Sequence, residues 1–211
     1  MDVSKSYAYG LEAGSKAELI IAMSKTPLGS PITVNGFKDK EMISLCFIAA
    51  KMGHNITVTI EGLGELETII QVNHEFNDTA KTPIAPKIGV RIRLHSSGIG
   101  VWAKSGGYSS KFGLTSTELL QAYGMLKENA LLDKLWMVHF HIGSQMSDIA
   151  PLKKALREAG NIYAELKMRG ANKLGAINIG GGLAVGDSQH EGKVERKYSL
   201  QEFANDVVYL M

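Results

Sequence analysis

Short apolar runs alternate with amphipathic segments along the whole chain. The apolar runs predict six β-strands, at residues 6–14, 30–36, 55–61, 86–94, 133–143 and 173–182. Apolar positions at helical spacing predict six helices, at residues 15–25, 38–53, 62–77, 115–131, 148–170 and 199–211. Ser15 is expected to cap the first helix together with Glu18, and Gly53 to end the second.

This regular alternation predicts an α/β fold with parallel strands and right-handed crossovers. The strand runs are continuously apolar, as expected when helices cover the sheet. Two architectures fit the pattern, an open doubly wound sheet and a (β/α)8 barrel, which usually takes about 250 residues. The chain has roughly two units too few for a whole barrel. No Gly-x-Gly-x-x-Gly motif opens the first crossover, which disfavours a dinucleotide-binding sheet.

The composition is that of an ordinary globular domain, with 211 residues, 45% apolar and 21% charged. A net charge of +2 without a basic run predicts neither nucleic-acid nor membrane-surface binding. No apolar run reaches the ~20 residues of a membrane span, and the first residues lack the layout of a signal peptide. Cys46, the only cysteine, lies in an apolar helix pattern, so we expect a core residue and a cytoplasmic chain.

Polar residues lie where the predicted strands end. In α/β folds, functional side chains gather at the carboxyl ends of the strands. A polar group inside an apolar run needs a partner, because burying it unpaired costs a few kcal/mol. A shared ligand could be that partner for the polar residues at these positions, which are Glu12, Asn35, Glu61, Arg91, Arg93, His139, His141 and Ser144.

Two strand ends carry the most specific signals. In "NIGGGLAV" (178–185), Gly180, Gly181 and Gly182 would let backbone N–H groups approach an anion such as phosphate; the alternative is a tight turn with positive φ. In "HFHIGSQ" (139–145), the alternation of a strand places both histidines on one face. They could contact a ligand, bind a metal with Glu61 as a further ligand, or be hydrogen-bonded core residues.

Two further side chains are expected to act with these segments. Ser144 could donate its hydroxyl to a phosphate. Arg91 needs a carboxylate if it is buried, and Glu12 is the nearest candidate in barrel order. A structural ion pair and direct contact with a ligand are both open for Arg91.

The sequence resembles the pyridoxal-phosphate (PLP) decarboxylases that are built on the alanine-racemase-like barrel. The resemblance rests on "LEAGSKAEL" (11–19), "PITVNGFKDKEMI" (31–43), "GVRIRL" (89–94), "SGGYSSKFGL" (105–114), "VHFHIGSQMSDI" (138–149) and "NIGGGLAV". Three of these, "NGFKDKE", "SGGYSSKFGL" and "HFHIGSQ", are typical of the arginine branch. The resemblance implies that residues 1–211 form part of a TIM-type (β/α)8 barrel that binds PLP. It also implies decarboxylation of L-arginine to agmatine and CO2 for polyamine synthesis.

The resemblance also implies roles for individual residues. His141 would stack on the pyridine ring, Ser144 and Gly180 to Gly182 would bind the phosphate with Gly182 closest to it, and Glu12 and Arg91 would lie beneath the cofactor. Substrate binding would involve Ile177, Asn178, Ile179, Leu183, Ala184 and Val185. The family forms homo-oligomers and is associated with magnesium, for which the sequence offers no clear set of ligands.

Several family features are missing from the 211 residues. The lysine that carries the cofactor is expected before residue 1, and the C-terminal β-domain after residue 211, so the isolated chain should be inactive. Lys38 and Lys111 are poor substitutes, because neither is expected to be desolvated. Gly186 and Asp187 depart from the family pattern. Two alternatives stay open: another PLP-barrel enzyme (a diaminopimelate or ornithine decarboxylase or an amino-acid racemase), or a non-catalytic decarboxylase-like binding protein.

Overall fold

The computed structural model describes residues 9–78, 83–95, 112–184 and 197–210. It contains all six predicted strands and all six predicted helices, with most ends trimmed by one to five residues. The strands are β1 (Leu11–Ala13), β2 (Pro31–Val34), β3 (Asn55–Ile60), β4 (Lys87–Arg91), β5 (Leu135–His139) and β6 (Ala176–Asn178). The helices are α1 (Lys16–Lys25), α2 (Lys40–Lys51), α3 (Leu63–Asn77), α4 (Ser116–Glu128), α5 (Ala150–Met168) and α6 (Leu200–Leu210), with a short 3₁₀ turn, η3, at Leu132–Lys134.

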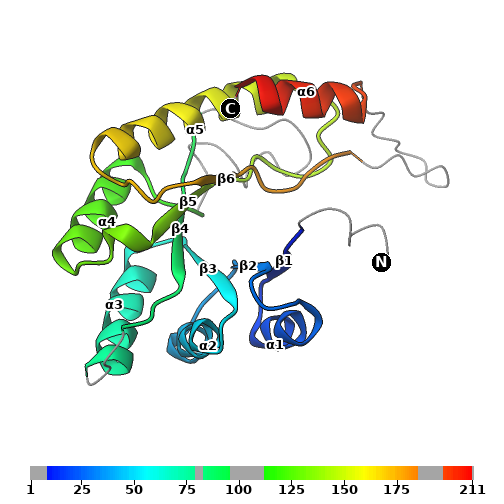
Figure 1. Ribbon diagram of the computed structural model, residues 1–211. Coiled ribbons are helices and arrows are strands. Elements are labelled where there is room, and N and C mark those ends of the chain that lie inside the picture. Colours follow the sequence, from blue (N-terminus) through cyan, green and yellow to red (C-terminus); the bar gives the residue numbers. More distant parts are fainter. Residues whose placement is uncertain (1–8, 79–82, 96–111, 185–196, 211) are drawn as a thin grey trace.

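All strand pairs are parallel, and the strands follow one another in chain order from β1 to β6. The sheet is curled, and the helices cover its outer side (Figure 1). Among the described residues the curled sheet does not close, because β1 and β6 each pair with one neighbour only. This is the incomplete α/β barrel that the sequence predicts, and it excludes the open doubly wound alternative, in which the strand order reverses.

The helix beginnings follow the local sequence. Ser15 accepts a hydrogen bond from the backbone N–H of Glu18, while the Glu18 carboxylate accepts one from Gly14 N–H at 2.6 Å. Thr115 and Glu118 form a complete capping box at α4. Such caps fix where a helix begins and typically contribute about 1 kcal/mol each.

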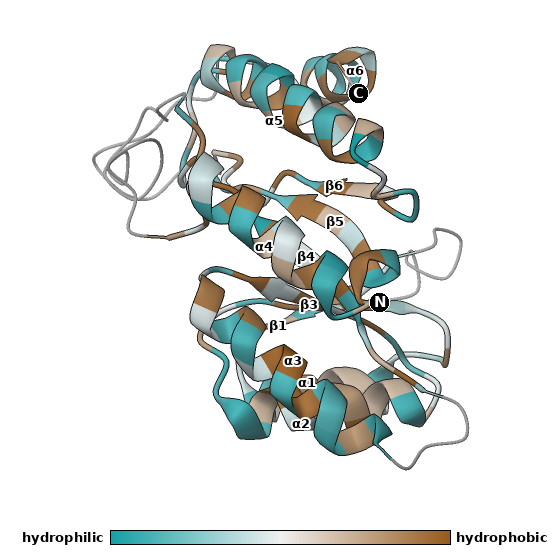
Figure 2. Ribbon diagram, turned by 90° about the vertical axis from the view of Figure 1, so that its left-hand side faces the viewer, coloured by the Kyte–Doolittle hydropathy of each residue, from teal (hydrophilic) through white to brown (hydrophobic). Residues whose placement is uncertain are grey.

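The core lies between the sheet and the covering helices. Figure 2 shows apolar stretches on the strands and on α1 and α2, whereas α5 is mixed along its length, with buried residues on one side only. Phe47 is fully buried and contacts the ring of Phe76 at 5.5 Å between centroids. Cys46 is also fully buried, and burial raises the pKa of its thiol to about 12, which confirms a core role. None of the described helices is long and apolar enough to cross a membrane.

Candidate functional site

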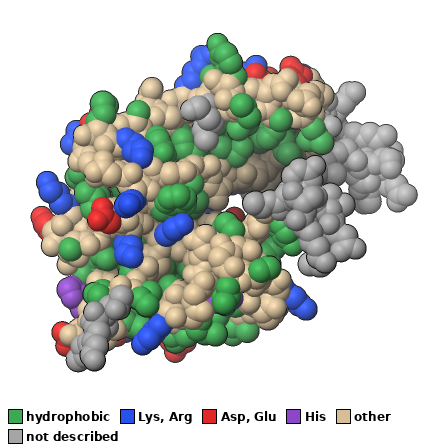
Figure 3. All heavy atoms as spheres, in the orientation of Figure 1, with side chains coloured by type: hydrophobic (Ala, Val, Ile, Leu, Met, Phe, Trp, Pro, Cys, Tyr) green, Lys and Arg blue, Asp and Glu red, His purple; other side chains and the backbone are tan. Residues whose placement is uncertain are grey.

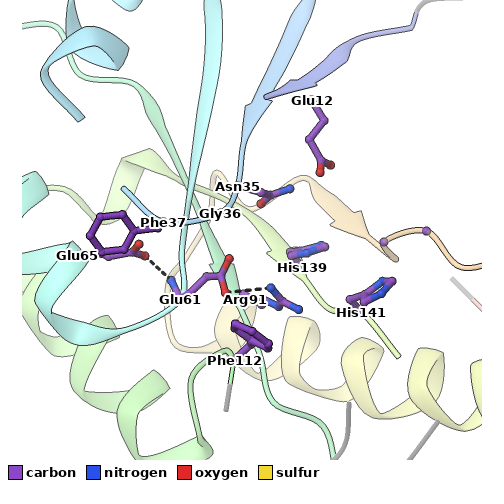
Figure 4. A pocket seen from close by; sticks show the side chains of 12 residues that line it. Glu12, Asn35, Gly36, Phe37, Glu61, Glu65, Arg91, Phe112, His139 and His141 are labelled. Carbon is purple, nitrogen blue, oxygen red and sulfur yellow. Dashed lines mark hydrogen bonds and ion pairs between the residues drawn. The ribbon is translucent and has the colours of Figure 1, made fainter. Parts of the chain in front are cut away.

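The carboxyl ends of all six strands meet around one cavity of about 480 Å³ (Figure 4). This volume lies in the usual range of small-molecule sites. The surface of the molecule is also visibly hollowed between the part with α1 and α2 and the part with α5 and α6 (Figure 3). The residues that line the cavity are Glu12, Asn35, Gly36, Phe37, Glu61, Glu65, Arg91, Phe112, His139, His141, Gly180 and Gly181. The histidines at the end of β5 and the glycines after β6 therefore line one cavity, as expected for residues at the carboxyl ends of parallel strands.

Arg91, the last residue of β4, pairs with Glu61. The sequence suggested Glu12 as its partner, and this prediction is wrong. Arg91 Nη1 lies 2.9 Å from Glu61 Oε2, and both side chains are largely buried, with 16% exposed. The reason is register, because Ile60 pairs with Val90 and Glu61 therefore follows directly beside Arg91. β2 and β3 lie between β1 and β4 in the sheet. The Arg91 guanidinium also lies 5.2 Å from the ring of Phe112.

Glu12 extends into the cavity from β1, on the side of Asn35 and away from Glu61 (Figure 4). Its carboxylate makes no ion pair or hydrogen bond with the described residues. Asn35 is 9% exposed, and its buried Oδ1 has no partner among the described residues either. This corner of the cavity thus holds polar groups that a ligand could satisfy.

His139 and His141 line the same cavity, as the strand alternation predicts. His139 is buried, and its Nδ1 lies 3.1 Å from the carbonyl oxygen of Asn178 on β6. His141 follows β5 and is half-buried. Burial, and secondarily the positive charge of Arg91, lowers the pKa of both imidazoles. A neutral His141 ring at the cavity surface is suited to packing against a flat ligand.

The glycine loop approaches His141 so closely that a side chain would not fit. A Cβ on Gly180 would come within 2.7 Å of His141 Nδ1 and 2.8 Å of the Phe140 carbonyl oxygen, and its φ is +70°. Gly180 N–H donates to Asn178 Oδ1 at 2.9 Å, which fixes the turn after β6. A Cβ on Gly181 would meet nothing within 4 Å and the residue is exposed, so this part of the loop is open to a ligand.

Gly182 and Ser144 are not among the residues that line the cavity. They lie where the loop after β5 packs against the glycine loop. A Cβ on Gly182 would lie 2.0 Å from the carbonyl oxygen of Gly143, and Gly182 O accepts the backbone N–H of Met146 at 2.8 Å. The loop that carries Ser144 therefore packs directly against the glycine loop. Their roles at a phosphate stay predictions.

The described members of the expected substrate-binding set do not line the cavity. Among the described residues, Asn178 acts through the hydrogen bonds named above, Leu183 forms an isolated bridge with Met146, and Ala184 is buried. The remaining two described members, Ile177 and Ile179, pack against the core. Val185, Gly186, Asp187 and Lys111 lie outside the described residues, so nothing tests what the sequence suggests for them.

Two basic residues differ from expectation. The sequence suggested that Lys38 is not desolvated, and this prediction is wrong. The Lys38 side chain is fully buried, with Nζ 3.1 Å from Glu65 Oε1 and donating to the Gly36 carbonyl oxygen. It still does not line the cavity, so it remains a poor substitute for a cofactor lysine. Arg93, one of the polar residues expected at strand ends, lies beyond the end of β4, donates to Gly113 O and does not line the cavity.

Sequence reasoning missed four lining residues, Gly36, Phe37, Glu65 and Phe112. Glu65 could have been found, because it lies one helical turn after Glu61, where the chain enters α3 after a strand end. Its Oε2 accepts the Glu61 backbone N–H at 2.7 Å. The described residues contain no group of three His, Cys, Asp or Glu that could hold a metal ion. Glu61 is already paired with Arg91, so the metal alternative with Glu61 as a ligand gains no support.

The comparisons with known proteins agree with this geometry. The family model described as "Pyridoxal-dependent decarboxylase, pyridoxal binding domain" matches residues 3–209. The chain belongs to this family. Biosynthetic arginine decarboxylase from Citrifermentans bemidjiense is 45% identical over 210 residues, covering 97% of this chain and 32% of that protein. The same-named protein from Rhodopirellula baltica is 41% identical over 203 residues, covering 95% of this chain and 29% of that protein.

Solved structures extend the likeness to three dimensions. The biosynthetic arginine decarboxylase of Campylobacter jejuni is 56% identical, with a TM-score of 0.84, and covers 99% of this chain and 33% of its own. A diaminopimelate decarboxylase from Helicobacter pylori has a TM-score of 0.76 at 23% identity, covering 99% of this chain and 49% of its own, which shows the shared fold alone. The chain thus spans about a third of the length of its curated relatives.

The cavity of this pyridoxal-binding domain fits a phosphorylated pyridine ring on its own evidence. Gly181 leaves backbone open, as a phosphate requires, and His141 offers a neutral ring for stacking. Arg91 supplies a fixed positive charge, and the unpartnered Asn35 amide offers a further polar contact. The residues present therefore fit PLP in size, charge and chemistry.

Proposed function

We propose that this chain supplies the PLP-binding part of the active site of an arginine decarboxylase, which releases CO2 from L-arginine and leaves agmatine. The single observation that carries the proposal is the convergence of His141, Arg91 and the glycine loop in one cavity, in a chain of the pyridoxal-binding family. The identity of 56% to an arginine decarboxylase supports arginine as the substrate. Because the chain spans a third of its relatives, the activity is proposed for the protein expressed from its complete reading frame.

Within this proposal, His141 packs its neutral imidazole against the pyridine ring. The backbone of Gly181 and the Ser144 hydroxyl would hold the phosphate, while Gly180 fixes the turn through Asn178 and Gly182 supports the loop against Gly143. These contacts would orient the ring. When bound, PLP supplies the electron sink that makes loss of CO2 from an amino acid feasible.

Arg91 and Glu12 have different positions in the proposed site. Arg91 is paired with Glu61, so it would provide a positive charge held in place next to the bound cofactor. Glu12 has no counter-ion among the described residues and is available to a cationic group of the cofactor or substrate. The proposed substrate residues flank the glycine loop and would act by placing it, since those that the structure describes (Ile177, Asn178, Ile179, Leu183 and Ala184) do not line the cavity.

The proposal is tested by PLP uptake and by a substrate panel. Protein from the complete reading frame is freed of cofactor, and PLP is added while its visible absorption is followed. The reconstituted protein is then given L-arginine, L-ornithine, L-lysine and diaminopimelate. We expect PLP to bind and CO2 to be released from arginine at the highest kcat/KM. Preference for another substrate would replace arginine in the proposal, and binding without turnover would favour a non-catalytic relative.

His141→Ala sharpens this test, with His74→Ala as a matched control. His74 is exposed on α3, away from the cavity. Because stacking contributes about 1 kcal/mol, we expect His141→Ala to weaken PLP binding about fivefold to tenfold. The control should bind PLP as the unchanged protein does. Equal affinities in both variants would remove His141 from the site.

The proposal also includes the homo-oligomer and the cytoplasmic location that the resemblance implies. Light scattering on protein from the complete reading frame should give a mass of at least two chains. Fractionation of cells should place the protein with cytoplasmic enzymes. The association of the family with magnesium is tested by measuring activity before and after dialysis against EDTA.

A further inference from the structure

Lys38 is a buried cation that the proposed chemistry does not use. It lies between β2 and α2, next to Asp39, which caps the helix, and none of its side chain is exposed. Burying an ammonium group is costly unless it is paired, and Lys38 has two partners, Glu65 Oε1 and the Gly36 carbonyl oxygen. Glu65 and Gly36 line the cavity, while Lys38 lies behind them.

From Lys38, a continuous chain of polar contacts leads to Arg91, and Figure 4 shows the part of it from Glu65 through Glu61 to Arg91. Glu65 accepts from Lys38 with Oε1 and from the Glu61 backbone N–H with Oε2, at 3.1 and 2.7 Å. Glu61 then pairs with Arg91 through its side chain at 2.9 Å. The network therefore consists of two ion pairs, Lys38–Glu65 and Arg91–Glu61, joined by the bond between the two glutamates, with only 16–17% of the Glu65, Glu61 and Arg91 side chains exposed.

We infer that Lys38 is a positioning residue: it keeps Glu65 occupied, so that Glu61 alone holds Arg91 beneath the ligand. Without Lys38, Glu65 would be a largely buried carboxylate without its counter-ion, one helical turn from Glu61. Arg91 would be the nearest cation in this network, and both glutamates would then compete for it. The guanidinium would move away from His141, and the charge under the ligand would be misplaced. The effect on PLP rests on the proposed function, whereas the effect on Arg91 does not.

A purely structural role for Lys38 makes a different prediction. If Lys38 only fixes the turn at Gly36, removing it should loosen that turn whatever charge Glu65 carries. If Lys38 acts through Glu65, neutralising Glu65 in the same protein should restore Arg91 to Glu61. A double variant therefore separates the two roles.

The experiment uses protein from the complete reading frame with Lys38→Met, Lys38→Gln and Lys38→Met combined with Glu65→Gln. Lys40→Met is the matched control, because Lys40 lies two residues later and its pair with Glu75 is on the surface, with 49% and 46% of the side chains exposed. Two quantities are measured: the Kd of PLP, and the ¹⁵Nε resonance of Arg91 in cofactor-free protein.

We expect Lys38→Met to weaken PLP about tenfold and to shift the Arg91 resonance. The double variant should return both to near the original values, and Lys40→Met should change neither. If Lys38→Met does not fold, Lys38→Gln decides, because it keeps a donor of similar length without the charge; we expect a weakening of about threefold and a shifted resonance. An unchanged resonance in the folded variants, or a double variant as weak as the single one, overturns the inference. If the unchanged protein takes up no PLP, the proposed function fails, while the Arg91 resonance still tests Lys38.

Discussion

The two sides of the cavity are built by opposite means. One side, which we call the charged side, consists of Glu61, Glu65 and Arg91 with Lys38 behind them, and each charge is paired with another of the same group. The other, which we call the neutral side, consists of His139, His141, Gly180 and Gly181 at the ends of β5 and β6. Figure 4 shows Arg91 between the two, beside the histidines.

This difference determines what each side can offer a ligand. The charged groups of the charged side are paired with one another, so they largely neutralise each other. This side therefore provides a fixed electrostatic environment for a ligand. The neutral side keeps its imidazoles uncharged by burial and by the nearby Arg91, and the Gly181 backbone stays open. Direct contact with a phosphorylated ring should therefore come mostly from the neutral side, and orientation of the charge beneath it from the charged side.

The largest expected effect is at the support of the neutral side, with Gly182→Ala. The new Cβ would lie 2.0 Å from the Gly143 carbonyl oxygen, at a φ of +115° that side chains rarely adopt. The Gly143 carbonyl is a backbone group, so the clash can be relieved only if the loop moves. We expect a loss of about 3 kcal/mol or more in the free energy of unfolding, measured by urea titration, and a weaker affinity for PLP.

Gly181→Ala is the matched control one residue away. Nothing lies within 4 Å of its Cβ position, and no positive φ is involved. Its stability should change by less than about 0.5 kcal/mol. Equal losses in the two variants would show that the loop does not depend on the close approach at Gly182.

The next largest effect is expected on the charged side, with Arg91→Met. Removal of the guanidinium leaves Glu61 largely buried without its partner, which should cost about 2–3 kcal/mol of stability. Arg169→Met is the control, because its pair with Glu165 is about half exposed and should contribute less than about 0.5 kcal/mol. Thermal unfolding of both variants at the same pH measures the difference, and a similar loss in each would contradict the assignment of a buried pair.

The smallest effect concerns the pH dependence of the neutral side. Burial first, and Arg91 second, lowers the pKa of His139 in the folded protein. The unfolded chain therefore binds more protons below its ordinary pKa of about 6.5. The stability that this histidine contributes is present above that pH and is lost as the pH falls through and below it.

His139→Gln removes the titrating group while retaining a side chain that can hydrogen-bond. The unfolding free energy of the variant should fall less steeply between pH 7.5 and 5.5 than that of the unchanged protein. At pH 7.5 a loss of about 1 kcal/mol is expected from the altered contact with Asn178. If the unfolding free energies of the two proteins fall in parallel over this pH range, the pKa of His139 is the same in the folded and unfolded chain.

Much of the fold could be predicted because local signals agreed with one another. The alternation of apolar runs and amphipathic segments predicts the order of the elements, and residues such as Ser15 predict where a helix begins. The parallel arrangement follows from that order. It also brings His141 and the glycines to one cavity, because parallel strands end on the same side.

The pairing of charges could not be predicted, because it depends on register and side-chain reach. Arg91 pairs with Glu61, which the register of β3 against β4 places beside it, whereas Glu12 belongs to β1, three strands away. The burial of Lys38 could not be predicted either. Its only local signal is that it precedes a helix, and residues at such positions are usually exposed. Its partner Glu65 belongs to a different strand–helix unit.

The sequential strand order has a consequence for how the protein is made. Each strand pairs with the one that precedes it in the chain, so every unit finds its docking site already formed when it leaves the ribosome. None of the described strands has to wait for a distant segment before it can pair with a neighbour. The cavity, however, needs the ends of β1 and β6 together, so a ligand can reach both Glu12 and the glycine loop only after the last of these units has been added.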